Sequence, residues 1–438
     1  MKETAQRIFR STLAAIDIPA TIEKKLARSC TLIDVYGARI DLAEFDEIVA
    51  IAFGKASVDM AQGLVRVIAP EIRPAGILVA PSAPPVDLLG WKVFVGGHPI
   101  PSDESFAAGR AILDQLARCD ELTLIFFLIS GGGSAMVEQP LDPAITLDDF
   151  RALHAALVTC GAPIEDMNAV RKHLSATKGG RLATAAPHSM KITLGVSDVP
   201  PGQESALASG PTLPDPTTVD DVIRVVAQYD LAAKVPPGIR KALDANALRE
   251  TPKPGDAAFA RSHFVMLLSE DELLHAARYA CEAEGYICVC DGSTNDWPAE
   301  KAADYLPAKL EALAAANPGK GVAILADGEL SSPVTGDGIG GRNAAFVLAC
   351  VEKIGGKEIT VLSAGTDGID GNSAAAGAVA DGETAARARA AGLDPRDFQR
   401  RSDSHRFFST LGDAIVTGPT GNNLRDLRIL LSGEPQKP

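Results

Sequence analysis

The sequence predicts an α/β protein in which helices cover a mostly parallel sheet. Apolar runs of strand length alternate with alanine-rich amphipathic stretches along the chain. In the first half these runs are 47–53, 75–80, 122–129 and 191–196. Three of them lead directly into glycine, serine, lysine or aspartate residues, and in open α/β sheets ligands bind beyond the carboxyl ends of the strands. We therefore expect functional residues at 54–55, 130–134 and 197–198.

A second set of strands follows a region that is rich in proline and glycine. The breaker residues concentrate at 235–238 and 251–256, and this composition is typical of a boundary. We expect two domains, residues 1–240 and 241–438. The candidate strands of the second domain are 264–268, 286–289, 321–325, 359–363 and 413–416.

Composition places the chain among globular cytoplasmic proteins. It has 438 residues, of which 46% are hydrophobic, and a formal net charge of -14. This charge argues against nucleic acid as a partner, although a small anionic ligand needs only a local basic pocket. Seven scattered cysteines indicate reduced thiols, and Cys288 and Cys290 lie in an alternating apolar run that favours a strand over a metal site. No apolar stretch approaches the length of a membrane span.

A glycine-rich loop follows the apolar run that ends near residue 129. It reads Ser130-Gly131-Gly132-Gly133-Ser134. Glycines let main-chain N–H groups turn toward an oxyanion, and a following helix adds a favourable field. The loop therefore predicts a phosphate site, although its spacing matches neither a Walker motif nor G-x-G-x-x-G, and a tight turn is the alternative.

The second half has three further loops of small residues. In the first, Gly340 and Gly341 precede Arg342 and the helical run 344–350, and the arginine offers a planar fork for a carboxylate or phosphate. The second, 363–371, holds Asp367 and Asp370, whose oxygens suit magnesium or a base for a hydroxyl, unless both are ordinary turn residues. The third covers 417–423.

Basic residues concentrate at two places in this acidic chain. The segment 168–182 contains Arg171, Lys172, Lys178 and Arg181. If it is helical, one face would present Arg171, Lys178 and Arg181 together. The alternative is that this basic face is only solvated. Lys55 follows an apolar strand directly, where its side chain would point above the sheet and neutralise phosphoryl oxygens.

Together these residues resemble a known family, the glycerate 2-kinases of the MOFRL type, some of whose members carry the name hydroxypyruvate reductase. The motifs occur in family order over nearly the whole chain: Gly54-Lys55-Ala56, Gly97-His98-Pro99, Ser130 to Ala135, Arg171 to Ser175 with Lys178 to Leu182, Ser197 to Pro200, Ser209 to Thr212, Gly340 to Asn343, Gly365 to Gly371 and Thr417 to Gly421. The resemblance implies transfer of the γ-phosphoryl group of ATP to the 2-hydroxyl of D-glycerate with a divalent ion, Mg²⁺. It also implies a Rossmann-like first domain and a second α/β domain ending in the MOFRL segment, with the active site between them.

From this resemblance and the residue types we expect the following site. Lys55 and Arg342 stabilise the transferring phosphoryl group, Arg171 or Lys172 holds the substrate carboxylate, and Asp198 and Asp367 bind magnesium or orient the hydroxyl. Further binding residues are Ser130, Gly131, Gly132, Gly133, Ser134, Asn168, Lys178, Gly340 and Gly341. The expected partners are ATP and a small hydroxy acid, without nucleic acid or membrane, and a homodimer stays open.

Several positions depart from the family pattern and leave the choice of hydroxy acid open. They are Gln203, Asp327, Ala344, Ala345 and Asn422, and most lie near loops of the second half. Two other functions stay as alternatives: an NAD(P)H-dependent reductase, for which the chain lacks a nicotinamide fingerprint, and a ligand-binding relative with little kinase activity.

Overall fold

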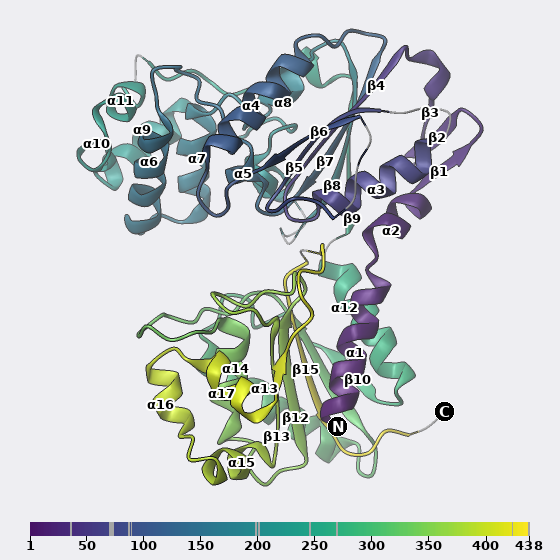
Figure 1. Ribbon diagram of the computed structural model, residues 1–438, viewed down its shortest axis with the longest axis vertical. Helices are drawn as coiled ribbons and strands as arrows, with labels where there is room; N and C mark the ends of the chain where they lie inside the picture. Colours follow the sequence, from purple (N-terminus) through teal and green to yellow (C-terminus); the bar gives the residue numbers. More distant parts are fainter. Residues whose placement is uncertain are drawn as a thin grey trace. The chain divides into compact units, whose positions relative to one another are not determined.

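The computed structural model describes residues 1–35, 37–69, 74–85, 88, 90–197, 199, 202–244, 247–268, 270–422 and 424–436. The chain divides into two compact units. Unit 2 is Ile18–Leu267, and unit 1 combines Met1–Asp17 with Leu268–Pro438. Figure 1 shows a sheet with helices in each unit, which confirms the α/β class.

The main sheet of unit 2 has six strands in the order β6-β5-β4-β7-β8-β9. Their bounds are β4 Glu47–Phe53, β5 Ala75–Ala80, β6 Trp91–Val95, β7 Thr123–Ser130, β8 Met190–Val196 and β9 Ser262–Leu268. The pairs from β6 through β8 are parallel, as predicted. Every residue of β7 is buried, which explains its unbroken apolar run, because both faces of a central parallel strand are covered.

Helices cover both faces of this sheet. On one face α3 (Ser57–Ile68) packs against β4, β5 and β7, and on the other α4 (Asp103–Leu116) and α8 (Arg181–Thr184) bury the alternate side chains of the same strands. Helix α4 begins at a reciprocal cap, in which the side chains of Ser102 and Ser105 each accept a hydrogen bond from the other's backbone.

Two smaller parts complete unit 2. Helices α6 (Leu147–Thr159), α7 (Ile164–Leu174), α9 (Val219–Gln228), α10 (Leu231–Lys234) and α11 (Pro237–Ala242) contribute to a separate apolar core. Helix α2 (Ile18–Lys25) leads into an antiparallel sheet of β1 (Leu26–Ser29), β2 (Leu32–Val35) and β3 (Ala38–Asp41).

The sheet of unit 1 has the order β10-β11-β15-β12-β13-β14. The strands are β10 Ile287–Cys290, β11 Val322–Asp327, β12 Ile359–Gly365, β13 Gly377–Asp381, β14 Ala414–Ile415 and β15 Asp426–Ser432. Only the β10–β11 pair is parallel in the described ladders, so the expectation of a mostly parallel sheet is wrong for this unit. The reason is β15, which returns from the end of the chain and inserts between β11 and β12 in the opposite direction.

Helices also cover both faces of this second sheet. One face packs against α13 (Ala299–Ala316), α14 (Arg342–Val351), α15 (Thr384–Ala390) and α17 (Ser404–Leu411), and α16 (Pro395–Arg400) lies against α14 and α17. The other face packs against α1 (Lys2–Ala15) and α12 (Glu270–Ala283). In Figure 1 the purple helix α1 lies beside α12 among the green strands of this unit.

The boundaries of these units, after Asp17 and after Leu267, differ from the expected single boundary between residues 240 and 241. Helix α1 belongs with the C-terminal half, where Lys2 Nζ lies 2.9 Å from Asp413 Oδ2 and Arg7 Nη2 lies 2.9 Å from Glu284 Oε2. Strand β9, expected in the second set, is instead the edge strand of the unit 2 sheet. The domains 1–240 and 241–438 themselves stay a prediction.

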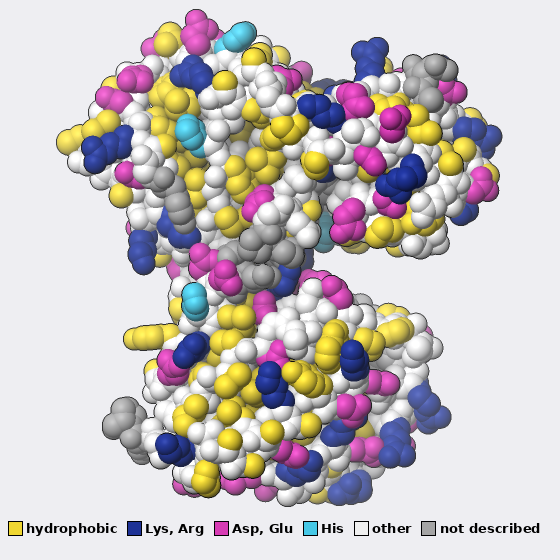
Figure 2. All heavy atoms as spheres, turned by 180° about the vertical axis from the view of Figure 1, so that it is seen from behind, with side chains coloured by type: hydrophobic (Ala, Val, Ile, Leu, Met, Phe, Trp, Pro, Cys, Tyr) yellow, Lys and Arg dark blue, Asp and Glu magenta, His cyan; other side chains and the backbone are white. Residues whose placement is uncertain are grey.

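The surface mixes charges of both signs. Figure 2 shows basic and acidic side chains interspersed over the visible face of each unit, without a broad basic surface. Within the part of the chain that the structure describes, none of the helices is both long and apolar enough to cross a membrane.

Candidate functional site

The glycine loop of unit 2 has the local structure that its sequence predicts. Strand β7 ends at Ser130, Gly132 adopts φ +82°, and the one-turn helix α5 (Gly133–Met136) follows. A Cβ atom on Gly133 would lie 2.8 Å from Cδ2 of Phe53, so a larger residue would not fit. The strand–glycine–helix order is therefore confirmed, and close packing against β4 is one reason for the glycines.

Lys55 lies beside this loop because β4 and β7 are neighbours. The backbone N–H of Lys55 donates to the carbonyl oxygen of Gly131 over 2.9 Å, and that of Ala56 donates to Ser130 Oγ over 2.9 Å. Strands β5 and β6 follow on one side of β4, whereas β8 and β9 follow on the other side of β7. The strand order thus reverses between β4 and β7, where open α/β sheets bind ligands.

Ser209 joins the glycine loop to helix α7. Its Oγ lies 2.9 Å from Ser134 Oγ and 3.5 Å from Asn168 Oδ1. Ser209 has φ +63° and Ala208 has φ +49°, conformations that non-glycine residues adopt at a cost and that concentrate at functional sites. The sequence-based set of site residues omits Ser209, although its motif with Gly210 was a signal.

The basic segment does not form one helical face. Helix α7 ends at Leu174 and α8 begins at Arg181, with left-handed Gly179 and Gly180 between them, so the predicted face is wrong. The alternative of a solvated face is also wrong for Lys172 and Lys178, because both are buried.

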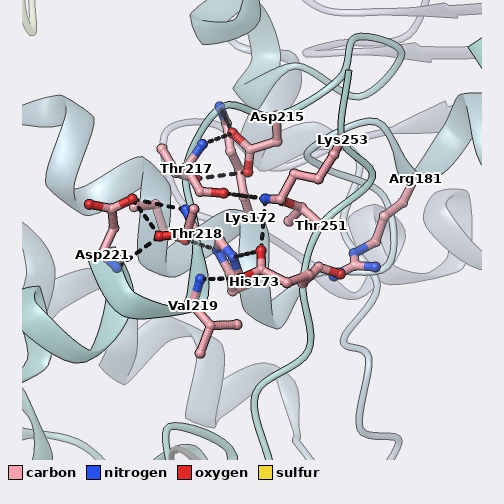
Figure 3. Close-up of polar contacts among 12 residues, drawn as sticks. Lys172, His173, Arg181, Asp215, Thr217, Thr218, Val219, Asp221, Thr251 and Lys253 are labelled. Carbon is pink, nitrogen blue, oxygen red and sulfur yellow. Dashed lines mark hydrogen bonds and ion pairs between the residues drawn. The ribbon is translucent and has the colours of Figure 1, made fainter. Parts of the chain in front are cut away.

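Each of these two lysines is paired with a buried carboxylate. Lys172 Nζ lies 3.0 Å from Asp215 Oδ1 (Figure 3), and Lys178 Nζ lies 2.7 Å from Glu138 Oε2. These two charges are therefore used inside the fold, and the prediction that Lys172 holds the substrate carboxylate has little support in its contacts. No local pattern indicates Asp215 or Glu138 as partners, because the lysines pair with them across about 40 residues.

Arg171 differs from these lysines. Its Nη2 lies 3.1 Å from Nδ1 of His154, and among the described residues no carboxylate lies within ion-pair distance of it. Burial lowers the pKa of Arg171 and, with the arginine charge, that of His154. Arg171 is one turn beyond Asn168 on α7 and therefore lies on the same side of that helix.

In unit 1 the predicted arginine lies between two carboxylates. Arg342 begins α14, and its Nη1 and Nη2 donate to the Glu329 carboxylate over 2.7 and 2.6 Å. Its Nε and Nη2 donate to the Asp426 carboxylate over 2.5 and 3.3 Å. Burial opposes the charge, but these carboxylates raise the pKa of Arg342 above its ordinary value.

Strand ends bring these groups to one edge of the sheet. Asp327 and Gly365 end β11 and β12, and Asp426, opposite Gly365, begins the antiparallel β15 between them. Fully buried Arg428 donates from Nη1 to the Gly328 carbonyl oxygen over 2.9 Å and so holds the turn before Glu329. Sequence reasoning missed the parts played by Asp426 and Arg428.

The two aspartates of the 363–371 loop have different environments. Asp370 is buried and caps α14, since its oxygens accept from the backbone N–H groups of Asn343 and Ala344 over 3.0 and 2.9 Å. Burial raises the pKa of Asp370 to about 6. Asp367 is half-buried, and its Oδ1 accepts from the Ile369 N–H over 3.0 Å in a turn.

The glycines before α14 are required by close packing. A Cβ atom on Gly341 would lie 2.3 Å from Asp370 Oδ1, and one on Gly340 would lie 2.2 Å from Ser404 Oγ. The Gly340 N–H donates to Asn372 Oδ1 over 2.8 Å, so this amide is already used within the fold.

Of the two aspartates expected to bind magnesium, Asp198 lies outside the described residues. Elsewhere, the described side chains form no group of three or more His, Cys, Asp or Glu arranged to hold a metal ion. Magnesium in phosphoryl-transfer sites is bound by one or two carboxylates together with substrate phosphates. The half-buried carboxylate of Asp367 fits such a site.

Known protein families and individual relatives match this chain over most of its length. Residues 4–244 match the family described as a domain of unknown function, DUF4147, and residues 322–426 match the MOFRL family. D-glycerate 2-kinase of Thermotoga maritima is 32% identical over 390 residues, which is 88% of this chain and 90% of the relative. A protein of Agrobacterium vitis is 35% identical over 394 residues, 88% of this chain and 87% of the relative, and carries a provisional hydroxypyruvate reductase name.

A solved structure is similar over nearly the whole length of this chain. The crystal structure of glycerate kinase from Thermotoga maritima superimposes with a TM-score of 0.84 at 30% identity, and the match covers 98% of this chain and 99% of that one.

Proposed function

Because the chain belongs to the DUF4147–MOFRL family that includes D-glycerate 2-kinase, we propose that it is an ATP-dependent kinase acting on the 2-hydroxyl of D-glycerate or a closely related hydroxy acid. The observation that carries this proposal is the position of Lys55 beside the Ser130–Ser134 loop, where the strand order of the unit 2 sheet reverses. A cation and a glycine-rich loop at such a point suit a phosphate.

The strand order supports a Rossmann-like assignment of unit 2. Numbered along the chain from β4, the order β6-β5-β4-β7-β8-β9 reads 3-2-1-4-5-6, which is the order of dinucleotide-binding folds. We propose that this sheet binds a phosphate of ATP or the phosphoryl group in transfer. We also propose that the protein acts in the cytoplasm.

In the proposed reaction the 2-hydroxyl oxygen attacks the γ-phosphorus, and the bond from that phosphorus to the bridging oxygen of ADP breaks. The hydroxyl proton leaves to a base, and ADP and the phosphorylated acid are released. Lys55 and Arg342 offset the charge on the phosphoryl oxygens, and Arg171 binds the carboxylate of the acid. Asp198 and Asp367 would hold magnesium, which neutralises phosphate charge when bound.

Asn168, Ser134 and Ser209 form the polar side of this proposed acid site. Ser209 links the side chains of Ser134 and Asn168, and each of the three can exchange one such hydrogen bond for one to a substrate hydroxyl. The glycines at 131–133 and 340–341 are proposed to leave room for the backbone to approach the phosphates.

A coupled ADP-release assay with purified full-length protein tests this function. With Mg²⁺ and ATP, D-glycerate is expected to give ADP, and phosphorus NMR places the phosphate on the 2- or 3-hydroxyl. Running longer aldonates in parallel defines the acid. If the protein oxidises NAD(P)H in the presence of hydroxypyruvate and releases no ADP in the presence of D-glycerate, it is a reductase. If ATP raises its melting temperature but the protein turns over none of the acids, it is a binding protein.

A further inference from the structure

The guanidinium of Arg342 is almost fully occupied by the protein itself. An arginine has five N–H donors, and four of them are used here. Nε and Nη2 each donate one hydrogen bond to Asp426, and Nη1 and Nη2 each donate one to Glu329. The outer edge, formed by Nη1 and Nη2, can bind an oxyanion in two places, as the edge formed by Nε and Nη2 binds Asp426. In this structure that edge holds the carboxylate of Glu329.

The two carboxylates differ in how firmly they are fixed. The side chain of Asp426 is 4% exposed and lies at the start of β15, opposite Gly365. The side chain of Glu329 is 41% exposed and follows β11 in a loop. A half-exposed ion pair is weak compared with a buried one, so Glu329 is the carboxylate that an incoming anion can replace.

The backbone of Glu329 does not need to move for this exchange. Its N–H donates to Asn295 Oδ1 over 2.9 Å, and its carbonyl oxygen accepts from the Asp296 N–H over 2.7 Å. With the main chain held at both groups, rotation of the side chain is sufficient to uncover Nη1 and Nη2.

We propose that Glu329 occupies the anion-binding edge of Arg342 in the free protein and leaves it when a substrate oxyanion binds, while Asp426 keeps the guanidinium in place. Glu329 is thus an internal competitor of the substrate, and Asp426 is a positioning residue. This inference rests on the proposed function for the identity of the anion: a phosphate of ATP is expected, because Arg171 is assigned to the carboxylate of the hydroxy acid, and that carboxylate is the alternative that the test distinguishes. Both offer two oxygens to the same edge.

Calorimetric titration of the full chain with ATP and, separately, with D-glycerate tests the exchange. The variant E329A is expected to bind the ligand that uses Arg342 at least fivefold more tightly than the wild type, and that ligand identifies the anion. E329Q keeps the size of the side chain without its charge and is expected to bind more tightly as well. D426N is expected to lower kcat and to weaken the binding of the same ligand, because Arg342 loses its charged, fixed partner.

A matched control separates direct competition from a general loss of negative charge. Asp337 is exposed in the loop that precedes Arg342, and D337A removes one negative charge from that loop. This variant is expected to change affinity by less than twofold. Equal gains in D337A and E329A would contradict the proposal.

The outcomes for this inference and for the proposed function are distinct. If neither E329A nor E329Q binds ATP or D-glycerate more tightly, the inference is wrong, even if the chain is a glycerate kinase. If either variant binds more tightly but neither it nor the wild type releases ADP with D-glycerate, the exchange stands and the proposed function fails.

Discussion

Lys172 and Asp215 form an ion pair inside unit 2, with Nζ 3.0 Å from Oδ1 and side chains that are 5% and 0% exposed. The pair ties helix α7 to the loop that precedes α9, and Thr217 donates to the same carboxylate from its N–H and its hydroxyl. A Cβ atom on Gly179 would lie 3.2 Å from Lys172 Cβ and 3.3 Å from Asp215 Oδ2. The pair therefore lies against the Gly179–Gly180 turn, which is bonded to Ser209 and Gly210.

Replacing Lys172 by Met is expected to lower the free energy of unfolding of unit 2 by about 3–5 kcal/mol, because Asp215 is left charged and unpaired in the interior. Urea unfolding followed by circular dichroism measures this loss. The exposed pair of Arg66 and Glu23 provides the control: R66M is expected to cost less than about 1 kcal/mol. Equal losses of unfolding free energy in the two variants would show that the buried pair stabilises the fold no more than the exposed pair does.

Replacing Lys55 by Met is expected to lower kcat/KM for phosphoryl transfer by about 10²–10³, because the charge that stabilises the phosphoryl oxygens is lost. The ADP-release assay measures the effect, and an unchanged melting temperature shows that the fold is kept. Lys24 is exposed on α2, and K24M serves as the matched control. Near-normal turnover of K55M would remove Lys55 from the site.

Replacing Arg171 by Gln is expected to raise KM for the hydroxy acid at least tenfold and to leave KM for ATP within about twofold, because a charge-assisted hydrogen bond to a carboxylate is lost. Initial rates at saturating ATP and at saturating acid separate the two constants. A rise in KM for ATP alone would place Arg171 at the nucleotide instead.

How much of this site was predictable depended on whether the interactions are local in sequence. The Ser130–Ser134 loop and the start of α14 near Arg342 were predicted, since an apolar run, glycines and a helical pattern lie next to one another. The partners of Lys172, Lys178 and Arg342 were not, because tertiary packing brings them in from distant segments.

The fold shows the same division. The parallel strands β4, β5, β7 and β8 of unit 2 could be read from their apolar runs, whereas the partly exposed edge strand β6 was not predicted. No local pattern shows that β9 pairs with the first sheet or that β15 inserts between β11 and β12. Strand order depends on long-range packing, and the sequence of a strand does not encode its neighbours.

Titration of Asp370 is expected to make the protein less stable as pH rises from about 4 to 7. Burial raises the pKa of Asp370 to about 6 in the folded state, against about 3.9 when unfolded. Between these values the folded state binds the extra proton, so the free energy of unfolding falls with pH, by up to about 3 kcal/mol from this group. Urea unfolding of wild type and D370N at pH 4.5 and 7.5 measures it.

The asparagine variant cannot titrate, so its free energy of unfolding lacks this contribution. The stability difference between wild type and D370N is therefore expected to shift by about 2–3 kcal/mol between the two pH values, to the disadvantage of the wild type at pH 7.5. A constant difference would mean that Asp370 is ionised in the folded state at both values, held so by the N–H groups of Asn343 and Ala344.

Replacing Gly54 by Ala is expected to disturb the site through the backbone. Gly54 has φ +116°, and a Cβ atom there would lie 2.4 Å from Ser130 Oγ and 2.5 Å from the Ser130 carbonyl oxygen. Gly161 has φ +80° with nothing within 4 Å of such an atom, so G161A carries the conformational cost alone, about 1–2 kcal/mol. G54A is expected to lose more stability than G161A and most of its kinase activity.

The comparison of these two glycines isolates the contact between β4 and β7, because both variants place alanine in a left-handed conformation. The extra loss in G54A arises from pushing Ser130 away, which breaks the hydrogen bond from the Ala56 N–H to Ser130 Oγ and shifts Lys55 from the glycine loop. Thermal unfolding and ADP release measure the two effects on the same samples. If G54A and G161A lose equal stability and both keep full activity, the approach of β4 to the loop does not position Lys55.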